Sequence, residues 1–511
     1  MSLEKLTKKE LIERVEELSN ELNHYQQLVA LYQKEKYGSK SEKSSNYDQL
    51  SLFDEIEVES TPIKIEPELE EITYKRKKKK GKRDLDLSKY ETEQIVYDVD
   101  NKVCDRCDSV IRKVSQNVRR ELIYIPAKYK VIEHIQYVYV CDHCDEDKTN
   151  FIKGAMPQAL LPKSVLSSSL ASDIIYNKFN LSLPLYRQEV MFKQNNLDIS
   201  RQTMSNWLTL LYDYYLVHMI NYMHKKLLKM KYIQADETTV QVLKEKDIAV
   251  STKSYMWVYK SGRSEEKQLI LYKYEPTRGH RYASVHLEGY KGILQTDGYQ
   301  AYDKVNNVTQ AGCLVHARRY FVTVLDAAPK NINKDEAFSH EIICEMQKLF
   351  KIEKDVSSKS YDEIKAYRQE KSKPIFEKMM ERIRYADTCH IPTESLKKAV
   401  TYCINQEQKL AAYLDDGRIE ISNTSTKRAI RNFCVGRKNW IFSNTPHGAH
   451  ASSCYYSIVE SAKMNNLNIR EYITHILSVL PNIDLYNENE LEKIMPWSNN
   501  LPKTVYQDKK S

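Results

Sequence analysis

Two pairs of cysteines constrain the folding of this chain more than any other feature. The first pair is Cys104 and Cys107, and the second is Cys141 and Cys144. Together they supply the four soft ligands that a tetrahedral Zn²⁺ ion prefers. The stretch YKVIEHIQYVYV between them is β-rich, so we expect a zinc ribbon over residues 91–155. Two redox-active motifs are the alternative, but a second pair at ribbon-like distance argues against it. Four protein ligands leave no open position, so this zinc would hold the fold.

The first 43 residues predict a dimerisation helix. Apolar side chains recur at intervals of four and three residues, the a/d rhythm of a coiled-coil seam. A monomeric surface helix is the alternative, but no neighbouring segment offers a core for this stripe. We therefore expect a homodimer through Leu11, Val15, Leu18, Leu22, Tyr25, Val29 and Tyr32.

Residues 44–90 are polar and change the sign of their charge along the way. An acidic stretch from Glu55 to Glu71 is followed by KRKKKKGKR, from Lys75 to Arg83. This composition predicts a flexible linker. Its basic run is either a solvated spacer or a sequence-independent contact with DNA phosphates, and the sequence supports the two interpretations equally.

Residues 156–228 have helical periodicity and contain a candidate DNA-binding motif. YRQEVMFKQNN, a break at residues 197–199 and SRQTMSNWLTLLYDYY follow the order of a helix-turn-helix, with Ser200 as the N-cap of the second helix. Paired helices are common in any α-domain, and it is the neighbouring zinc ribbon and basic linker that strengthen this interpretation. The residues expected to face a DNA groove are Arg201, Gln202, Ser205 and Asn206.

From Tyr232 the sequence becomes strand-like. The runs YIQADETTVQV, SYMWVYKS and KQLILYKYEP predict an antiparallel meander, GILQTDGYQAY a fourth strand and GCLVHARRYF a fifth. Asp236 closes the first run and Asp297 the fourth, so their carboxylates would lie side by side if these strands are neighbours. Such hard oxygen ligands suit Mg²⁺ or Mn²⁺, which can activate a nucleophile for phosphoryl transfer. A single aspartate at a strand end is more often a turn former, and it is the pair that favours a metal site.

Several stretches together resemble the transposases of the insertion-sequence-66 class, over nearly the whole chain. The resemblance implies a ribonuclease-H-like DDE catalytic domain in which Asp236 and Asp297 are the first and second catalytic aspartates. It also implies metal-dependent hydrolysis that frees a 3′-hydroxyl, followed by attack of that hydroxyl on target DNA. The matching stretches are YGSKSEK, the cysteine pairs with IPAKYKVIEHI between them, QADETTVQVL, LQTDGYQAY, CLVHARRYF, VGRKNWIFSNTPHGAHAS and YYSIVESAKMNNLNIREYI.

The third acidic residue of that family pattern is absent from this chain. The pattern is Asp-Asn-Asn, two variable residues and Glu-Arg, whereas residues 422–428 are SNTSTKR, so Lys427 stands where the glutamate is expected. A protonated lysine has no lone pair with which to bind Mg²⁺. We take Glu420 as the third catalytic residue, with Glu460 as the alternative carboxylate and an impaired enzyme as the remaining interpretation.

Basic residues gather around the same stretches of sequence. Arginine binds phosphate oxygens through two parallel hydrogen bonds, so these residues are candidate DNA contacts. Surface charges or salt bridges are the alternative for each, and a packed histidine for the first of them. The candidates are His316, Arg318, Arg319, Arg428, Arg437 and Lys438.

Length and composition set the outer limits. A chain of 511 residues and 60.0 kDa is too long for one core and predicts three or four domains. The 78 basic and 70 acidic residues give a net charge of +8, too small to establish nucleic-acid binding. A mean hydropathy of −0.62, without a run of about 18 apolar residues, excludes a membrane protein. The first residues lack the apolar core of a signal peptide, so we expect a cytoplasmic, bacterial, nucleoid-associated protein.

We therefore expect a multidomain α+β transposase that binds the ends of a mobile element and catalyses metal-dependent cleavage and strand transfer. Double-stranded DNA at the element ends and target would be its partner, with accessory proteins of the same element as possible further ones. A catalytically impaired, transposase-derived DNA-binding protein is the main alternative, and a nuclease without joining activity is another. The expected domains are 1–43 coiled coil, 44–90 linker, 91–155 zinc ribbon, 156–228 helical DNA-binding region, 229–327 first catalytic part, 328–415 helical insertion, 416–482 final catalytic part and 483–511 C-terminal tail.

Overall fold

The computed structural model describes residues 129–140, 151–246, 252–327, 337–389, 391 and 393–507. The predicted coiled coil, the linker and the four cysteines of the predicted zinc site lie outside the described residues. Contacts divide the chain into two units, one of residues 65–157 and one of residues 1–64 and 158–511. In the first unit, strand β1 (Val138–Val140) pairs antiparallel with β2 (Phe151–Lys153).

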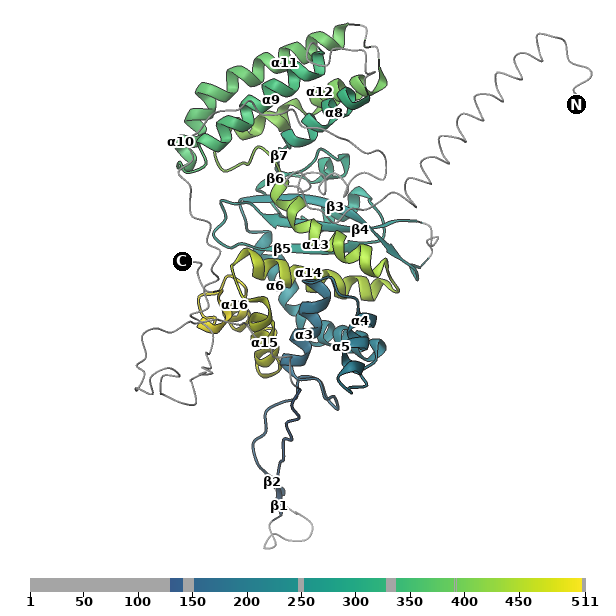
Figure 1. The fold of residues 1–511 in the computed structure, drawn as a ribbon. Coiled ribbons are helices and arrows are strands. Elements are labelled where there is room, and N and C mark those ends of the chain that lie inside the picture. The colour runs from purple at the N-terminus through teal and green to yellow at the C-terminus, as the bar shows by residue number, and fades with distance from the viewer. Residues whose placement is uncertain are drawn as a thin grey trace, which may run out of the picture. The chain divides into compact units, whose positions relative to one another are not determined.

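The second unit is built on a mixed sheet in the order β5-β4-β3-β6-β7 (Figure 1). The first three strands in sequence pair antiparallel, which confirms the predicted meander, and β3 then pairs parallel with β6 and β6 with β7. A short strand, β8, pairs parallel with the far end of β3. The strands are β3 (Tyr232–Val242), β4 (Ser254–Ser261), β5 (Ile270–Glu275), β6 (Ile293–Gln295), β7 (Thr309–Ala311) and β8 (Phe442–Ser443).

The prediction of a fifth strand at GCLVHARRYF was wrong. The strand is Thr309–Ala311, and helix α8 (Leu314–Ala327) begins just after it. Leu314, Ala317 and Phe321 are buried at intervals of three and four residues, which is a helical period. The error arises because a short apolar run flanked by polar residues does not distinguish a strand from a helix.

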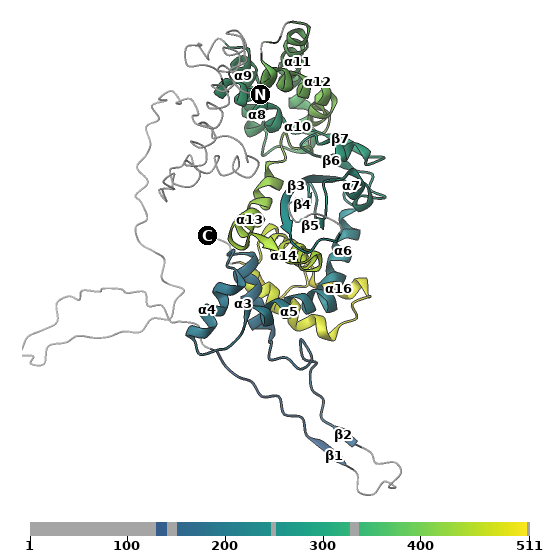
Figure 2. The same cartoon turned by 90° about the vertical axis from the view of Figure 1, so that its right-hand side faces the viewer.

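Helices cover both faces of the sheet (Figure 2). On one face, Phe433 of α13 and Tyr456 of α14 lie against Tyr272 of β5. On the other, His286 of α7 stacks on Tyr259 of β4. The four covering helices are α13 (Thr424–Trp440), α14 (Pro446–Met464), α6 (Val217–Leu227) and α7 (His280–His286).

A second helical layer joins the main core through α14. Phe179 stacks on Tyr455 of α14 with ring centroids 4.7 Å apart, and the Tyr222 hydroxyl of α6 donates to Glu492 at 2.6 Å. The expected C-terminal tail contributes buried residues to this core, among them Leu491 and Ile494. The layer contains α3 (Ser168–Phe179), α4 (Leu185–Gln194), α5 (Arg201–Leu211), a π-helical turn (Tyr212–Leu216), α15 (Ile469–Val479) and α16 (Glu488–Ile494), with short 3-10 turns at Leu480–Asn482 and Lys503–Val505.

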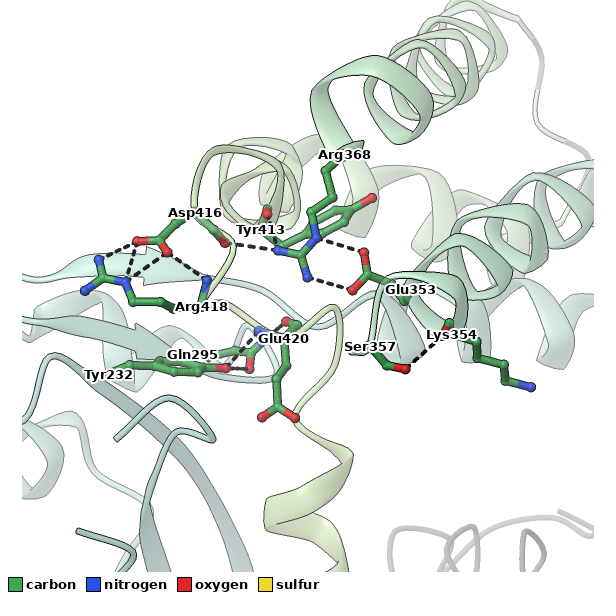
Figure 3. A network of polar contacts seen from close by, with 10 residues as sticks. All are labelled: Tyr232, Gln295, Glu353, Lys354, Ser357, Arg368, Tyr413, Asp416, Arg418 and Glu420. Carbon is green, nitrogen blue, oxygen red and sulfur yellow. Dashed lines mark hydrogen bonds and ion pairs between the residues drawn. The ribbon is translucent and has the colours of Figure 1, made fainter. Parts of the chain in front are cut away.

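A bundle of helices between β7 and α13 has its own hydrophobic core. Arg368, which is 2% exposed, holds its ends together: its guanidinium pairs with Glu353 and donates to the carbonyl oxygens of Tyr413 and Asp416 at 2.7 and 3.0 Å (Figure 3). The chain therefore returns to the sheet in a fixed position. The bundle consists of α8, α9 (Phe338–Asp355), α10 (Tyr361–Tyr367), a π-helical turn (Arg368–Ser372), α11 (Lys373–Thr388) and α12 (Glu394–Asp415). None of the helices in the described ranges is long and apolar enough to cross a membrane.

A half-buried pair of histidines predicts acid sensitivity. His286 stacks between Tyr259 and His224 of α6, and burial, His224 and Lys273 hold the pKa of His286 well below its usual value. The pKa of His224 is lowered as well, mainly by burial. Unfolding frees both rings to bind protons, so stability is fully present above about pH 6.5 and falls below it, by at most about 1.4 kcal/mol per pH unit for each ring.

The variant His286→Phe keeps the stack but cannot take up a proton. We expect its free energy of unfolding, measured with denaturant between pH 7.5 and 5, to fall less steeply than that of the natural protein. Its stability at neutral pH should be similar, because the buried Nε2 of His286 has no hydrogen-bond partner within the described residues. Equal slopes for both proteins would contradict this account of the stack.

Candidate functional site

Asp236 and Asp297 lie at corresponding positions relative to two neighbouring strands. In the parallel pairing of β3 with β6, Gln234 lies opposite Gln295, so each aspartate follows its paired glutamine by two residues. These two strands are neighbours, which is the condition under which the sequence places the two carboxylates side by side. Asp236 does not close its strand, because β3 continues to Val242, and its side chain is only 4% exposed.

The backbone around Asp297 is held by the helical bundle. The Tyr402 hydroxyl of α12 donates to the Asp297 carbonyl oxygen at 2.7 Å, and the Tyr299 amide donates to the Asp297 carboxylate at 2.9 Å. Gly298 has a φ of +90°, a conformation that favours glycine, and turns the chain directly after the aspartate. A helix far along the sequence thus fixes one of the two carboxylates.

Lys427 reaches these aspartates from α13. The lysine is 7% exposed, and α13 covers the face of the sheet toward which Asp236 points. Burial lowers the pKa of Lys427, and the charges of Asp236 and Asp297 act in the opposite direction. Burial likewise raises the pKa of Asp236, against the positive charge of Lys427. A lysine therefore lies next to the carboxylates where the family pattern has a glutamate.

His316 and Arg319 complete the surroundings from α8. His316 is 7% exposed, and positive charge there lowers the pKa of Asp236. The charge of Arg319 lowers the pKa of Lys427. Sequence reasoning missed Cys313, which is fully buried here. Burial by itself would raise the pKa of the Cys313 thiol, but His316 and Lys427 lower it to about 7. The spacing Cys-x-x-His was the signal that could have identified it.

The residue after Asp236 points to the opposite face of the sheet, as alternation along a strand requires. The Glu237 carboxylate accepts a hydrogen bond from Tyr302 at 2.6 Å and from the Arg278 Nε at 2.7 Å. Burial raises the pKa of Glu237, as does the negative charge of Asp297, while Arg278 opposes them. Asp297 thus lies near carboxylates on both faces, and Glu237 is already neutralised by its own partners.

Glu420 belongs to a neighbouring polar cluster (Figure 3). Its carboxylate accepts from the Gln234 side chain at 2.7 Å, and its carbonyl oxygen accepts from Gln295 at 2.6 Å. Burial raises the pKa of Glu420, and the positive charge of Lys260 opposes this rise more than any other cation does. The charges that change the pKa of Asp236 most are instead those of Lys427 and Asp297. Glu420 therefore ties the loop before α13 to the sheet.

Glu460 also lies in other surroundings. Its carboxylate accepts from the Asn432 side chain at 2.8 Å and from Lys463 at 2.6 Å. The same Asn432 amide donates to the carbonyl oxygen of Phe179, so Glu460 helps to join α3, α13 and α14.

The two carboxylates fit a divalent cation in part. Mg²⁺ is commonly bound through one or two carboxylates, with substrate phosphates and waters in the other positions, and Asp236 and Asp297 match that requirement. A third ligand of this kind is absent, because in the described part of the chain three or more His, Cys, Asp or Glu side chains nowhere group to hold a metal. The described side chains fit a cation held by two carboxylates and do not fit a three-carboxylate site.

The predicted helix-turn-helix segment contains two helices, α4 and α5, with a turn between them. The Ser200 side chain caps α5 by accepting from the Thr203 amide at 3.1 Å, as expected. The four residues expected to face DNA lie on the first two turns of α5 and all are exposed: Arg201, Gln202, Ser205 and Asn206.

The other basic candidates differ in how exposed their side chains are. Arg437 is engaged, because its guanidinium donates to the backbone oxygen and the hydroxyl of Thr239 in β3. Arg428 and Lys438 are exposed on α13, and Arg318 is half-buried on α8. The positive charge of Arg428 lowers the pKa of Glu420 and that of Lys260.

Comparison with known proteins identifies the family. The model of the Transposase IS66 family matches residues 163–451, more than half of the chain. The zinc-finger binding domain of transposase IS66 matches residues 101–145, and Transposase C of IS166 homeodomain matches residues 24–87. The zinc-finger match includes all four cysteines of the two pairs.

Similar curated proteins come from Sinorhizobium fredii (strain NBRC 101917 / NGR234). Uncharacterized protein y4qI is 25% identical over 506 residues, which cover 95% of this chain and 91% of that protein. Uncharacterized protein y4hP is 24% identical over 411 residues, covering 77% and 73%. The sheet with its paired aspartates lies within the longest family match, and this chain belongs to the IS66 family of transposases.

Proposed function

We propose that this chain is a transposase that binds the ends of a mobile DNA element and cleaves and joins DNA at Asp236 and Asp297. The observation that carries this proposal is the parallel register of β3 and β6, which brings both carboxylates to one place on a sheet flanked by helices. The strand order β5-β4-β3-β6-β7 supports a ribonuclease-H-like catalytic domain, interrupted by the bundle α9–α12.

Asp236 and Asp297 would hold Mg²⁺ or Mn²⁺, and the bound cation would supply positive charge to the phosphate oxygens of the scissile bond. Arg319 and His316 lie close enough to add positive charge for the same phosphate. The buried position of Asp236 keeps water from screening these charges. This arrangement favours in-line displacement at phosphorus, first by water and then by a DNA 3′-hydroxyl.

The remaining parts would serve recognition and assembly. We assign zinc to Cys104, Cys107, Cys141 and Cys144, on the strength of their spacing and the zinc-finger match. The apolar repeat in residues 1–43 supports a homodimer. Accessory proteins of the same element would be further partners.

The exposed start of α5 predicts a specific DNA contact. The double variant Arg201→Ala with Asn206→Ala should bind the element's own end about tenfold or more weakly, because base contacts are worth about 1–3 kcal/mol each. Binding to a scrambled duplex should change much less. Fluorescence anisotropy measures both affinities.

The matched control for that variant is Arg187→Ala with Gln194→Ala, which removes one charge and one amide from exposed positions on α4. It should affect the end and the scrambled duplex equally. The Arg201→Ala, Asn206→Ala variant could instead prefer the element end over the scrambled duplex as strongly as the natural protein does. That result would exclude α5 as the helix that contacts the bases.

Lys427 favours a second candidate function. A buried lysine beside the aspartates supplies the charge that a cation would otherwise bring, so the chain would be a DNA-binding protein with impaired catalysis, able to compete with active copies. A nuclease without joining activity is the third candidate, and it would release cleaved ends without joined products.

The test of the proposed function is incubation of the full chain with labelled element-end DNA and Mg²⁺ or Mn²⁺. Nicked and joined products are expected, and neither should form when the cation is chelated. Tight end binding without either product under any condition would favour the impaired form, and the absence of end binding would reject both.

A further inference from the structure

A basic pocket lies at the ends of the strands where the parallel strands β3, β6 and β7 begin, and the aspartates lie further along β3 and beyond β6. It encloses about 470 Å³ between the residues that precede β3 and β6, the start of β7 and the loop before α13. Asp236 comes four residues after the first residue of β3, so the pocket is roughly 13 Å along the strand from that carboxylate. The lining includes Lys229, Lys231, Gly289, Lys291, Gly292 and Arg418.

The pocket carries several positive charges, of which Arg418 is paired with Asp416 and Lys229 lowers the pKa of Glu488. Lys229, Lys231 and Lys291 are exposed, and none of them forms an ion pair with a residue that the structure describes. Arg418 is different, because its guanidinium is bound to Asp416 (Figure 3). The three lysines therefore provide the attraction for an anion.

An acidic side chain at the start of β3 is already bound to the backbone. The Glu265 carboxylate accepts the amides of Lys231 and Tyr232 at 3.1 and 2.9 Å. Its position at the start of β3 is thereby fixed by two hydrogen bonds, and it is not paired with a lysine of the pocket.

The backbone of the pocket also presents donors. Across the described ranges, the amides of Gly289, Lys291 and Gly292 donate to no protein acceptor. Gly289 has a φ of +82°, and a Cβ at Gly292 would lie 2.5 Å from the carbonyl oxygen of Lys231, so both positions favour glycine. Amides without protein acceptors, in a turn with positive φ and near ammonium groups, are the kind of donors that bind an anion.

We propose that this pocket binds a phosphate group of the DNA backbone, at a place separate from the aspartates. Lysine is a compact point charge that suits phosphate without reading sequence, so this contact would hold any duplex. The phosphate held here lies too far along the sheet to be the one that reacts at Asp236. The inference rests on the proposed action on DNA and adds a second contact to it.

The test compares the triple variant Lys229→Gln, Lys231→Gln and Lys291→Gln with a control triple, Lys359→Gln, Lys378→Gln and Lys397→Gln. The control lysines are exposed on or beside the bundle helices, and both variants lose the same charge. Affinity for a duplex of random sequence is measured by fluorescence anisotropy across salt concentrations, and folding is checked by thermal unfolding. The pocket variant should bind about tenfold more weakly, with a salt slope reduced by about 1, and the control variant should change less in both respects.

Equal affinity and slope for the pocket variant and the natural protein would overturn the proposal, as would failure of the natural protein to bind random duplex at low salt. Calorimetry with inorganic phosphate tests the other source of this ligand. Tight phosphate binding that the pocket variant loses, with unchanged DNA affinity, would assign the site to free phosphate and reject the DNA contact. Cleavage of element ends is assayed separately. If the natural protein cleaves no ends while the pocket variant binds random duplex more weakly than the control variant, the proposed catalysis is rejected and the phosphate site in the pocket is supported.

Discussion

Replacement of Asp236 by asparagine is expected to reduce DNA cleavage by about 10³-fold. The change removes one charged oxygen ligand at almost constant shape, and loss of about 4 kcal/mol of transition-state stabilisation corresponds to that factor. Asp297→Asn should have a similar effect, because the parallel register gives the two carboxylates equivalent places on neighbouring strands. The measurement is the single-turnover rate of nicking on labelled element-end DNA.

A loss of cleavage in Asp236→Asn is distinguished from a loss of DNA binding or of folding in two ways. Binding of end DNA should be nearly unchanged in Asp236→Asn, because the side chain is buried and α5 is untouched. Glu420→Gln is the matched control, since it also neutralises a largely buried carboxylate, but one that hydrogen-bonds Gln234. It should retain most of the activity. Greater loss in Glu420→Gln than in Asp236→Asn would return Glu420 to the catalytic role that the sequence suggested.

Replacement of Lys427 by glutamate is expected to make the stability of the folded protein depend on divalent cations. Without a cation, a third carboxylate beside Asp236 and Asp297 adds repulsion and lowers the free energy of unfolding. With Mn²⁺ at about 100 times its dissociation constant, binding should restore about 2.7 kcal/mol. The natural protein should gain much less from Mn²⁺, since Lys427 already supplies positive charge there. Chemical denaturation with and without Mn²⁺ measures both effects.

Cleavage should rise in the same variant if the natural lysine limits the enzyme. We expect an increase of about 10²-fold in the rate of strand transfer, from a more firmly held cation. Lys427→Met is the matched control, because it removes the ammonium group without adding a ligand. An increase in both variants would show that the lysine's charge alone is inhibitory. A Lys427→Glu protein with neither Mn²⁺-dependent stability nor added activity would mean that Lys427 does not occupy the cation position.

The surroundings of Glu420 depend on contacts that the sequence does not report. Glu420 lies close to the expected position in sequence, which is why the sequence favours it as the third acidic residue. In the structure, the loop before α13 is held by Tyr232, Gln234 and Gln295, which directs Glu420 toward Lys260. Those partners lie more than 100 residues away, and a pattern read along the chain does not report them.

The family, the antiparallel meander and the capped start of α5 could all be predicted from the amino-acid sequence. These follow from local periodicity, side-chain preferences and spacing, which act over a few residues. The fold was needed to show that β3 and β6 are neighbours, that Lys427 is buried beside the aspartates, that Tyr402 of the bundle holds Asp297, and that three lysines share a pocket at the other end of the strands. The physical reason is that burial and charge depend on which distant segments meet, and the packing of the whole sheet with its helices sets those meetings.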